Sequence, residues 1–174
     1  LVFNHKDEDV FEVVRSEGDN AGTYDIYVEI INDNYTVLFE KASYVINPKV
    51  VAKPTAITGL VYNNELLEGV KDNEGYSVED GFAIEADTHI AYVSLDSKQN
   101  YVWEDGTTSD LEIEYVIALR QIEVVIDDQE VTYGDEEATL TYTLSGDLAK
   151  GHEDEDVFEI VRVSGDNVGE YEIS

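Results

Sequence analysis

The sequence contains no cysteine, which excludes disulfide bonds and any site built on thiolates. Basic residues are scarce, with 10 Lys and Arg against 40 Asp and Glu, and the formal net charge is −30. Nucleic acid and anionic membranes would be repelled by such a surface, so we expect neither as a partner. No apolar run approaches the roughly 18–20 residues that span a bilayer, so we expect no membrane insertion in this segment.

The sequence also lacks an initiating Met and a charged-then-apolar leader, and it begins in the middle of a pattern. We therefore expect a piece of a longer protein. Apolar residues make up 43% of the chain, enough for packed cores, and its 12 tyrosines are typical of half-buried strands. A length of 174 residues fits one large domain or two small ones.

A long internal repeat dominates the sequence. Residues 148–174 match residues 1–27 at 16 of 27 positions, with an offset of 147 residues, and the shared run includes Asp-Glu-Asp-Val-Phe-Glu. Chance does not produce such a match. We interpret the chain as one full period of a tandem array plus an overlap.

A weaker period lies inside the long one. Asn34-Tyr35-Thr36-Val37 parallels residues 100–103, and Val61-Tyr62-Asn63-Asn64-Glu65 resembles residues 132–136. We therefore expect two related modules in alternation. Residues 47–118 form one complete module. The other is split, with its C-terminal portion at 1–46 and the N-terminal portion of its next copy at 119–174.

Apolar and polar residues alternate along much of the chain, which is the period of a strand and not of a helix. The alternation is clearest at residues 24–30, 110–115, 121–126 and 139–144. Turn signals lie at Asn63-Asn64, Asp105-Gly106, Gly134-Asp135 and Gly146-Asp147. The expected fold class is all-β: tandem small antiparallel β-sandwiches of the Ig-like kind, ~70–75 residues each, in an elongated arrangement. Only residues 64–70 and 147–152 are candidates for a helical turn.

One turn motif occurs twice, as Asn20-Ala21-Gly22-Thr23-Tyr24 and as residues 167–171. It resembles the tyrosine corner of immunoglobulin domains, in which a Tyr ring enters the core and its hydroxyl bonds to backbone a few residues upstream. In the complete module the equivalent residues are 85–91, where Asp87 replaces Gly and His89 replaces Tyr. We expect an altered corner there.

The junctions between modules are expected to be stiff. Residues 44–51 and 116–122 join the modules without a flexible Gly/Ser linker, and Pro48 fixes one backbone angle. Modules this small are marginally stable alone, so stacking against neighbours adds interface energy. Trp103, beside the Asp105-Gly106 turn, is expected as a core anchor and not as a ligand platform.

Residues 122–135, Leu140-Thr141-Tyr142 and the turn at 165–171 resemble the MBG-type repeat of bacterial surface proteins. That family has a strand ending in Tyr-Gly-Asp, a Leu-Thr-Tyr strand and a Gly-Asp-Asn-x-Gly-x-Tyr turn. Through residues 58–63 and 101–108, the complete module is similar to a companion Ig-like repeat of bacterial cell-wall and secreted adhesins. The resemblance implies an extracellular place on the bacterial cell surface and an adhesin-like or stalk-forming role, sometimes towards mucin or glycans. It transfers no catalytic residue.

The sequence offers little for catalysis or cofactor binding. His5 and His152 are copies of one position and His89 is the third histidine, so no repeat unit has the cluster that a transition-metal site needs. Ser94 lies near His89 in the sequence, but neighbours on one strand do not make a triad. We therefore expect no enzyme, no catalytic residue and no cofactor.

The acidic cluster at residues 7–9, copied at residues 154–156, is the best candidate for a cation site. Asp7, Asp9, Asp154 and Asp156 could supply oxygens to Ca²⁺, but the spacing and central Gly of an EF-hand loop are missing. A solvated acidic loop is the alternative.

Two lysines raise a different chemical question. Lys41 and Lys49 lie on or beside predicted strands and are candidates for a Lys–Asn isopeptide crosslink. Ordinary surface lysines are the alternative, since the sequence identifies no buried acid that would assist the reaction.

Three functions fit these observations unequally. The first is a stalk or spacer in a bacterial adhesin. The second is an adhesin module that binds host glycan or mucin by multivalent avidity, with Tyr62, Tyr92 and Tyr101 available to stack on sugars. An enzyme is the third and least supported.

Neighbouring repeats of the same protein are the expected partners. Residues 1–46 lack the strands that 119–147 represent, and residues 119–174 lack what 28–46 represent. Unfinished sheets expose edges. Either two molecules complete each other head to tail, or both ends continue in a longer protein.

Overall fold

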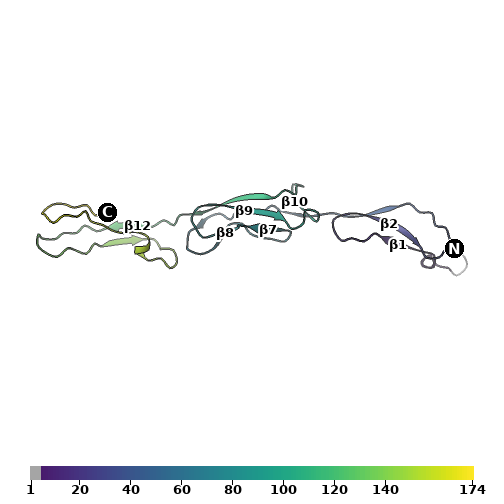
Figure 1. The fold of residues 1–174 in the computed structure, drawn as a ribbon, viewed down its shortest axis with the longest axis horizontal. Helices are drawn as coiled ribbons and strands as arrows, with labels where there is room; N and C mark the ends of the chain where they lie inside the picture. The colour runs from purple at the N-terminus through teal and green to yellow at the C-terminus, as the bar shows by residue number, and fades with distance from the viewer. Residues whose placement is uncertain (1–4) are drawn as a thin grey trace. The chain divides into compact units, whose positions relative to one another are not determined.

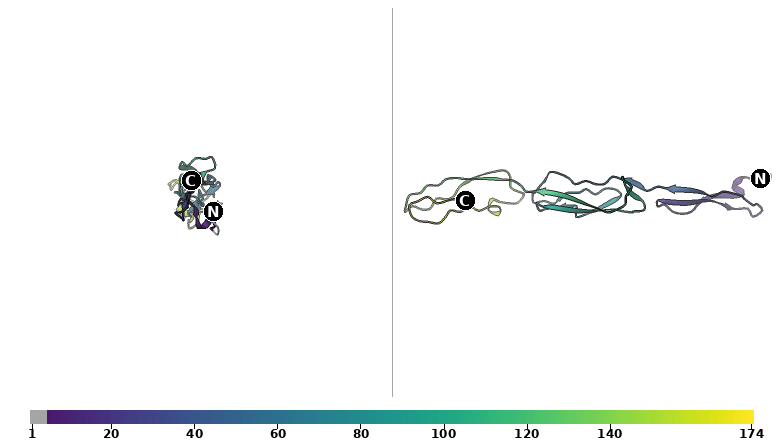
Figure 2. Two further views of the ribbon diagram at one scale, coloured as in Figure 1. Left: turned by 90° about the vertical axis from the view of Figure 1, so that its right-hand side faces the viewer. Right: turned by 90° about the horizontal axis from the view of Figure 1, so that it is seen from above.

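The computed structural model describes residues 5–174, which form short strands joined by turns and loops (Figure 1). Helix is limited there to two three-residue 3₁₀ turns, η1 (Asp7–Asp9) and η2 (Asp154–Asp156). Views from two other directions likewise show no long helix in this part of the chain (Figure 2). Among residues 5–174, no helix has the length and apolar character needed to cross a membrane. The chain is all-β, as predicted.

The strands are short, and most of them come from the segments that alternate in polarity. In chain order they are β1 (Phe11–Arg15), β2 (Gly22–Ile30), β3 (Ala42–Ile46), β4 (Lys49–Val51), β5 (Leu60–Val61), β6 (Leu67–Glu68), β7 (Tyr76–Glu79), β8 (Phe82–Ala83), β9 (Thr88–Leu95), β10 (Tyr101–Trp103), β11 (Leu111–Ala118), β12 (Glu123–Ile126) and β13 (Tyr142–Ser145).

The chain divides into two compact units. The first runs to Pro54 and includes Asp72–Glu79 and Tyr92–Leu111. The second consists of Thr55–Lys71, Asp80–Ala91 and Glu112–Ser174. The module boundaries at residues 46/47 and 118/119 stay a prediction.

The first unit contains a three-stranded antiparallel sheet in the order β1-β2-β3. Phe11 pairs with Ile30 and Val13 pairs with Val28 across β1 and β2. Because side chains on a strand alternate between faces, these four apolar residues lie on one face of the sheet.

The largest sheet has four strands in the order β5-β11-β9-β7. Its buried side chains alternate with exposed ones, as at Ala91, Val93 and Leu95 in β9 and at Tyr115 and Ile117 in β11. This is the period-two pattern of the sequence, and it buries one face of these two strands.

Two strand pairs depart from the predicted antiparallel arrangement. β4 pairs with β10 in parallel, and β5 pairs with β11 in parallel. A parallel pair needs a long crossover connection, and about fifty residues separate the two members of each pair. Small antiparallel pairs β6-β8 and β12-β13 complete the sheets.

Residues 152–174 share a pairing and a turn with their copy at residues 5–27. Arg162 pairs with Ile173 in the register that Arg15 and Ile26 have in β1 and β2. The turn η2 likewise repeats η1. The duplicated sequence therefore specifies this pairing and this turn twice, although only the first copy forms continuous strands.

All four predicted turns contain a residue with left-handed backbone. These are Asn64 (φ 59°), Gly106 (φ 80°), Gly134 (φ 93°) and Gly146 (φ 97°). Glycine and asparagine tolerate this conformation best, which explains why these dipeptides were reliable signals.

The two candidate helical turns were wrong. Residues 64–70 contain β6, and residues 147–152 form a non-helical turn. The short helices lie at η1 and η2 instead, where the carboxylates of Asp9 and Asp156 accept hydrogen bonds from backbone N–H groups three residues earlier. These capping bonds favour a helical turn directly after an extended residue.

Candidate functional site

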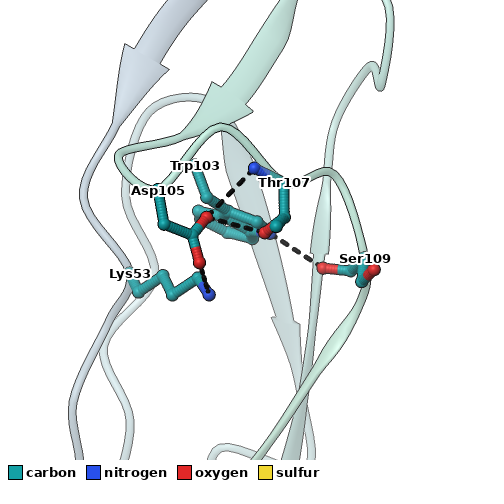
Figure 3. Close-up of polar contacts among 5 residues, drawn as sticks. All are labelled: Lys53, Trp103, Asp105, Thr107 and Ser109. Atoms are coloured by element: carbon teal, nitrogen blue, oxygen red, sulfur yellow. Dashed lines mark hydrogen bonds and ion pairs between the residues drawn. The ribbon is translucent and has the colours of Figure 1, made fainter.

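Trp103 is a buried anchor in the core of the first unit. Its side chain is 0% exposed, and its ring lies against Tyr76 with centroids 5.6 Å apart. The indole N–H donates to the Ser109 carbonyl at 2.8 Å (Figure 3). A buried and satisfied indole has no free face for a ligand, so the core interpretation of Trp103 is confirmed.

The turn after Trp103 is held by Asp105 (Figure 3). One carboxylate oxygen accepts from Lys53 Nζ at 2.6 Å, and the other accepts from the Thr107 hydroxyl at 2.7 Å and the Thr107 backbone N–H at 3.0 Å. The Lys53 hydrogen bond, followed by those of Thr107, holds the pKa of Asp105 well below its usual range. The arrangement fixes the turn that follows Trp103.

Both predicted tyrosine corners form. The Tyr24 hydroxyl donates to the Asn20 carbonyl at 2.7 Å, and the Tyr171 hydroxyl donates to the Asn167 carbonyl at 2.9 Å. The ring of Tyr24 lies against Gly18, where a Cβ would overlap it. Glycine is therefore required there by close approach.

A third corner lies at residues 85–91, and there a histidine makes the contact that a tyrosine makes in the other two. His89 Nε2 donates to the Glu85 carbonyl at 2.9 Å, four residues upstream as in the tyrosine corners. Its ring stacks on Tyr115, with centroids 5.3 Å apart. Asp87, which replaces Gly, accepts a hydrogen bond from the Thr88 backbone N–H. The corner is altered in composition, as predicted, and it keeps its hydrogen bond.

Within the first unit, side-chain hydrogen bonds join the Tyr24 corner to the turn before β10. The Ala21 N–H donates to Asn100 Oδ1 at 2.7 Å, and Asn100 Nδ2 donates to Asn20 Oδ1 at 2.7 Å. Gln99 Nε2 donates to the Ala21 carbonyl at 2.9 Å. Three hydrogen bonds thus cross the predicted junction at residues 44–51.

Within the second unit, a comparable set joins the turn after β5 to residues 150–152. Asn64 Nδ2 donates to the Lys150 carbonyl at 2.9 Å, and the Lys150 N–H donates to the Asn63 carbonyl at 3.2 Å. The Lys150 ammonium pairs with Glu65, and this hydrogen bond raises the lysine pKa. Arg120 Nε donates to the Tyr62 carbonyl at 2.8 Å.

The candidate calcium residues have other partners in the structure. Asp9 and Asp156 cap η1 and η2, and Asp154 accepts from the Tyr142 hydroxyl, a bond that raises the pKa of Tyr142. Asp7 accepts from the Val10 N–H through its backbone carbonyl. Among residues 5–174, no three or more His, Asp or Glu side chains are grouped so as to hold a metal. The calcium assignment stays a prediction.

The remaining reactive residues lie apart. His89 and Ser94 are five residues apart on β9, so their side chains point to opposite faces. Lys41 lies 4.0 Å from Asp25, and Lys49 forms a 2.7 Å ion pair with Glu74. Both lysine side chains are more than half exposed, which fits ordinary surface lysines.

The three candidate sugar-stacking tyrosines have different surroundings. Tyr92 is about half exposed on β9, and Tyr62 lies beside His152 with ring centroids 5.9 Å apart. Tyr101 lines a shallow hollow of about 180 Å³ in the first unit, together with Asp19, Ala21, Ile46, Asn47, Lys49 and Asn100. The structure therefore brings Tyr101 to a concave surface.

Sequence reasoning missed the junction residues Gln99, Asn100 and Arg120, and it missed Lys53. Asn100 begins the repeated Asn-Tyr phrase, but its counterpart Asn34 bonds only locally to Asn32. The repeat therefore gave no signal for a junction role.

Residues 122–174 match the family model described as the MBG domain (YGX type). This domain is a repeat domain typical of surface proteins. The match supports the MBG-type resemblance over the last part of the chain, which holds the Tyr133-Gly134 turn and the Tyr171 corner. The companion Ig-like repeat stays a prediction. Comparisons with curated proteins and with solved structures gave no match.

Proposed function

We propose that the chain is a non-catalytic repeat segment of a bacterial surface protein and that it acts as a stalk or spacer in an adhesin. One observation carries the proposal: specific side-chain hydrogen bonds cross both predicted junctions, through Asn100 in one unit and through Lys150 and Asn64 in the other. A spacer needs such contacts, because they keep successive modules from rotating freely.

Two further observations support it. The MBG match supports a place outside the cell on a surface protein. The titratable residues singled out in the sequence are engaged in caps, corners and turns, as Asp105 and His89 are. Their roles are structural, and neighbouring repeats of the same protein are the natural partners.

The second candidate is a glycan- or mucin-binding module that works by avidity. The hollow beside Tyr101 favours it, because an aromatic ring next to Asn47 and Asp19 can both stack on a sugar and bond to its hydroxyl groups. Weak single sites could then add up over many copies.

Display of the chain on a tetrameric carrier separates the two functions. The spacer predicts no signal on mucin or on a glycan array, even at tetramer avidity. The adhesin predicts a signal that disappears with Tyr101→Ala and persists with Tyr92→Ala, the matched exposed tyrosine. This result would show that the chain binds glycan or mucin, and it would contradict the spacer function.

A further inference from the structure

β8 is an edge strand of the small antiparallel pair β6-β8. Leu67 pairs with Ala83 and Glu68 pairs with Phe82 across the two strands. In the part of the chain that the structure describes, no strand other than β6 pairs with β8. The second edge of β8 therefore carries backbone N–H and C=O groups that have no strand partner.

The pairing pattern shows which backbone groups face this open edge. The N–H of Gly69 donates to the carbonyl of Gly81 at 2.8 Å. Hydrogen-bonded and non-hydrogen-bonded pairs alternate along an antiparallel ladder, so Ala83 lies in a bonded pair, whereas Phe82 lies in a non-bonded one. The N–H and C=O groups of Phe82 and Ile84 then point away from β6 and towards the open edge.

Three large apolar side chains lie exposed beside this edge. Phe82 is 52% exposed and Ile84 is 40% exposed, and because they are two residues apart they lie on one face of the strand. Leu66, which is 63% exposed, lies opposite Ile84 when the register of Leu67 with Ala83 is continued by one residue. A strand added to the edge would cover these side chains with apolar residues of its own.

Acidic residues flank the apolar segment at both ends. Asp80 precedes Gly81-Phe82-Ala83-Ile84, and Glu85 and Asp87 follow it. All three are exposed, and none of them forms an ion pair with a Lys or Arg side chain within residues 5–174. Their charges are therefore available to a basic partner.

We propose that the β8 edge binds an extended segment of a partner protein by adding it as a further strand to the β6-β8 pair. Apolar residues at alternate positions of the segment pack against Phe82 and Ile84. Lys or Arg at its two ends pairs with Asp80 and Glu85. Backbone hydrogen bonds supply affinity, and the side chains on either side of the edge supply specificity. This inference concerns recognition of a protein, so it goes beyond the spacer function and does not depend on it.

A second copy of the chain fits this edge poorly. Antiparallel pairing of two β8 strands about Ala83 would place Asp80 of one copy beside the partner's Glu85 at each end. Both chains also have a net charge of −30. Like charges on adjacent strands destabilise their pairing, so a basic segment is the occupant that the charges favour.

Titration of the full chain with an end-capped peptide, Lys-Lys-Val-Thr-Val-Thr-Val-Lys-Lys, tests the edge by NMR. We expect saturable shifts at the amides of Phe82 and Ile84, together with slower hydrogen exchange there. The same peptide with Glu in place of each Lys should cause no shift.

A second control separates strand addition from charge attraction. The basic peptide with N-methyl groups on its Val and Thr residues keeps the charges and side chains but cannot donate backbone hydrogen bonds. It is expected to bind at least about tenfold more weakly. Equal binding of the two basic peptides, or shifts that leave Phe82 and Ile84 unchanged, would overturn the proposal.

Phe82→Ala and Tyr92→Ala are the matched variants. Both residues are aromatic and about half exposed, and Tyr92 lies on β9 of the four-stranded sheet. Phe82→Ala is expected to raise the dissociation constant of the basic peptide about tenfold, because it removes an apolar contact, whereas Tyr92→Ala should leave it unchanged. Equal effects of the two variants would contradict the proposal, as would a dimer of the chain that Phe82→Ala dissociates, since the edge would then bind a second copy.

The double variant Asp80→Asn and Glu85→Gln tests the charges. Asparagine tolerates the positive φ of Asp80 (56°), so the turn before β8 is expected to be kept. The variant should bind the basic peptide more weakly than the wild type and with a smaller dependence on salt concentration. Unchanged affinity and salt dependence would show that these two carboxylates do not select the partner, and the proposed basic segment would be wrong.

Discussion

The side chains of Tyr24 and His89 make one contact with two different chemistries. The Tyr24 hydroxyl donates to Asn20 O and the His89 ring donates to Glu85 O, in each case to the carbonyl four residues upstream. The corner is thus defined by a ring that reaches back to the backbone, and an imidazole N–H can replace a phenol O–H. This is why a motif that departs from the pattern in sequence keeps its geometry.

His89→Ala is expected to destabilise the fold by about 1–2 kcal/mol, because it removes a hydrogen bond and the stacking on Tyr115. Denaturant unfolding of the chain, followed by the fluorescence of Trp103, its one tryptophan, measures the change. His89→Tyr should keep most of the stability. If His89→Ala were as stable as the wild type, the corner at residues 85–91 would contribute nothing to the free energy of unfolding.

Gly69→Ala is expected to cost about 3 kcal/mol, because the new Cβ would overlap the buried Tyr115 ring. Gly59→Ala is the control. Its φ of +78° is strained for alanine, but no atom lies within 4 Å of the added Cβ, so about 1 kcal/mol is expected. The same Trp103 fluorescence measures both. Equal costs for the two substitutions would mean that the ring moves aside easily.

The alternation of polarity determined much of this fold, and the core of β9 and β11 follows it residue by residue. The two parallel pairs were not predictable, since alternation does not say which distant strand is the neighbour. The capped turns η1 and η2 were missed because a run of three acidic residues is too short to show the periodicity of a helix. Asn100 and Lys53 act through contacts that span 79 and 52 residues, and no local pattern encodes those contacts.

The pKa of Asp105 gives a prediction for acid titration. Because its folded-state pKa is depressed below the ordinary aspartate value of 3.8, its stabilisation is complete above that pH and is lost as the pH falls through the folded-state pKa. NMR titration of the side-chain carboxyl carbon should show Asp105 still ionised when typical exposed aspartates are half protonated. Lys53→Met should move its titration up towards the ordinary range. Titration of wild-type Asp105 together with ordinary aspartates would contradict the Lys53 and Thr107 contacts.

Calcium is expected to stabilise the chain only by screening its charge. Asp9 and Asp156 already accept backbone hydrogen bonds at η1 and η2, so a specific site would have to disrupt both caps. The melting temperature in EDTA, in millimolar Mg²⁺ and in millimolar Ca²⁺ at equal ionic strength measures this. The two cations should raise it equally. A larger rise with Ca²⁺ that disappears in Asp7→Asn or Asp154→Asn would establish the calcium site.

The central claim is that side-chain contacts hold the junctions in one conformation. Because the chain has no cysteine, spin labels can be placed on paired cysteines at the exposed residues Glu12 and Glu104 in the first unit, and at Glu114 and Thr143 in the second. Electron–electron double resonance should give a narrow distance distribution for each pair. The first should broaden with Asn100→Ala and the second with Asn64→Ala. Broad distributions in the otherwise unchanged chain would contradict the account.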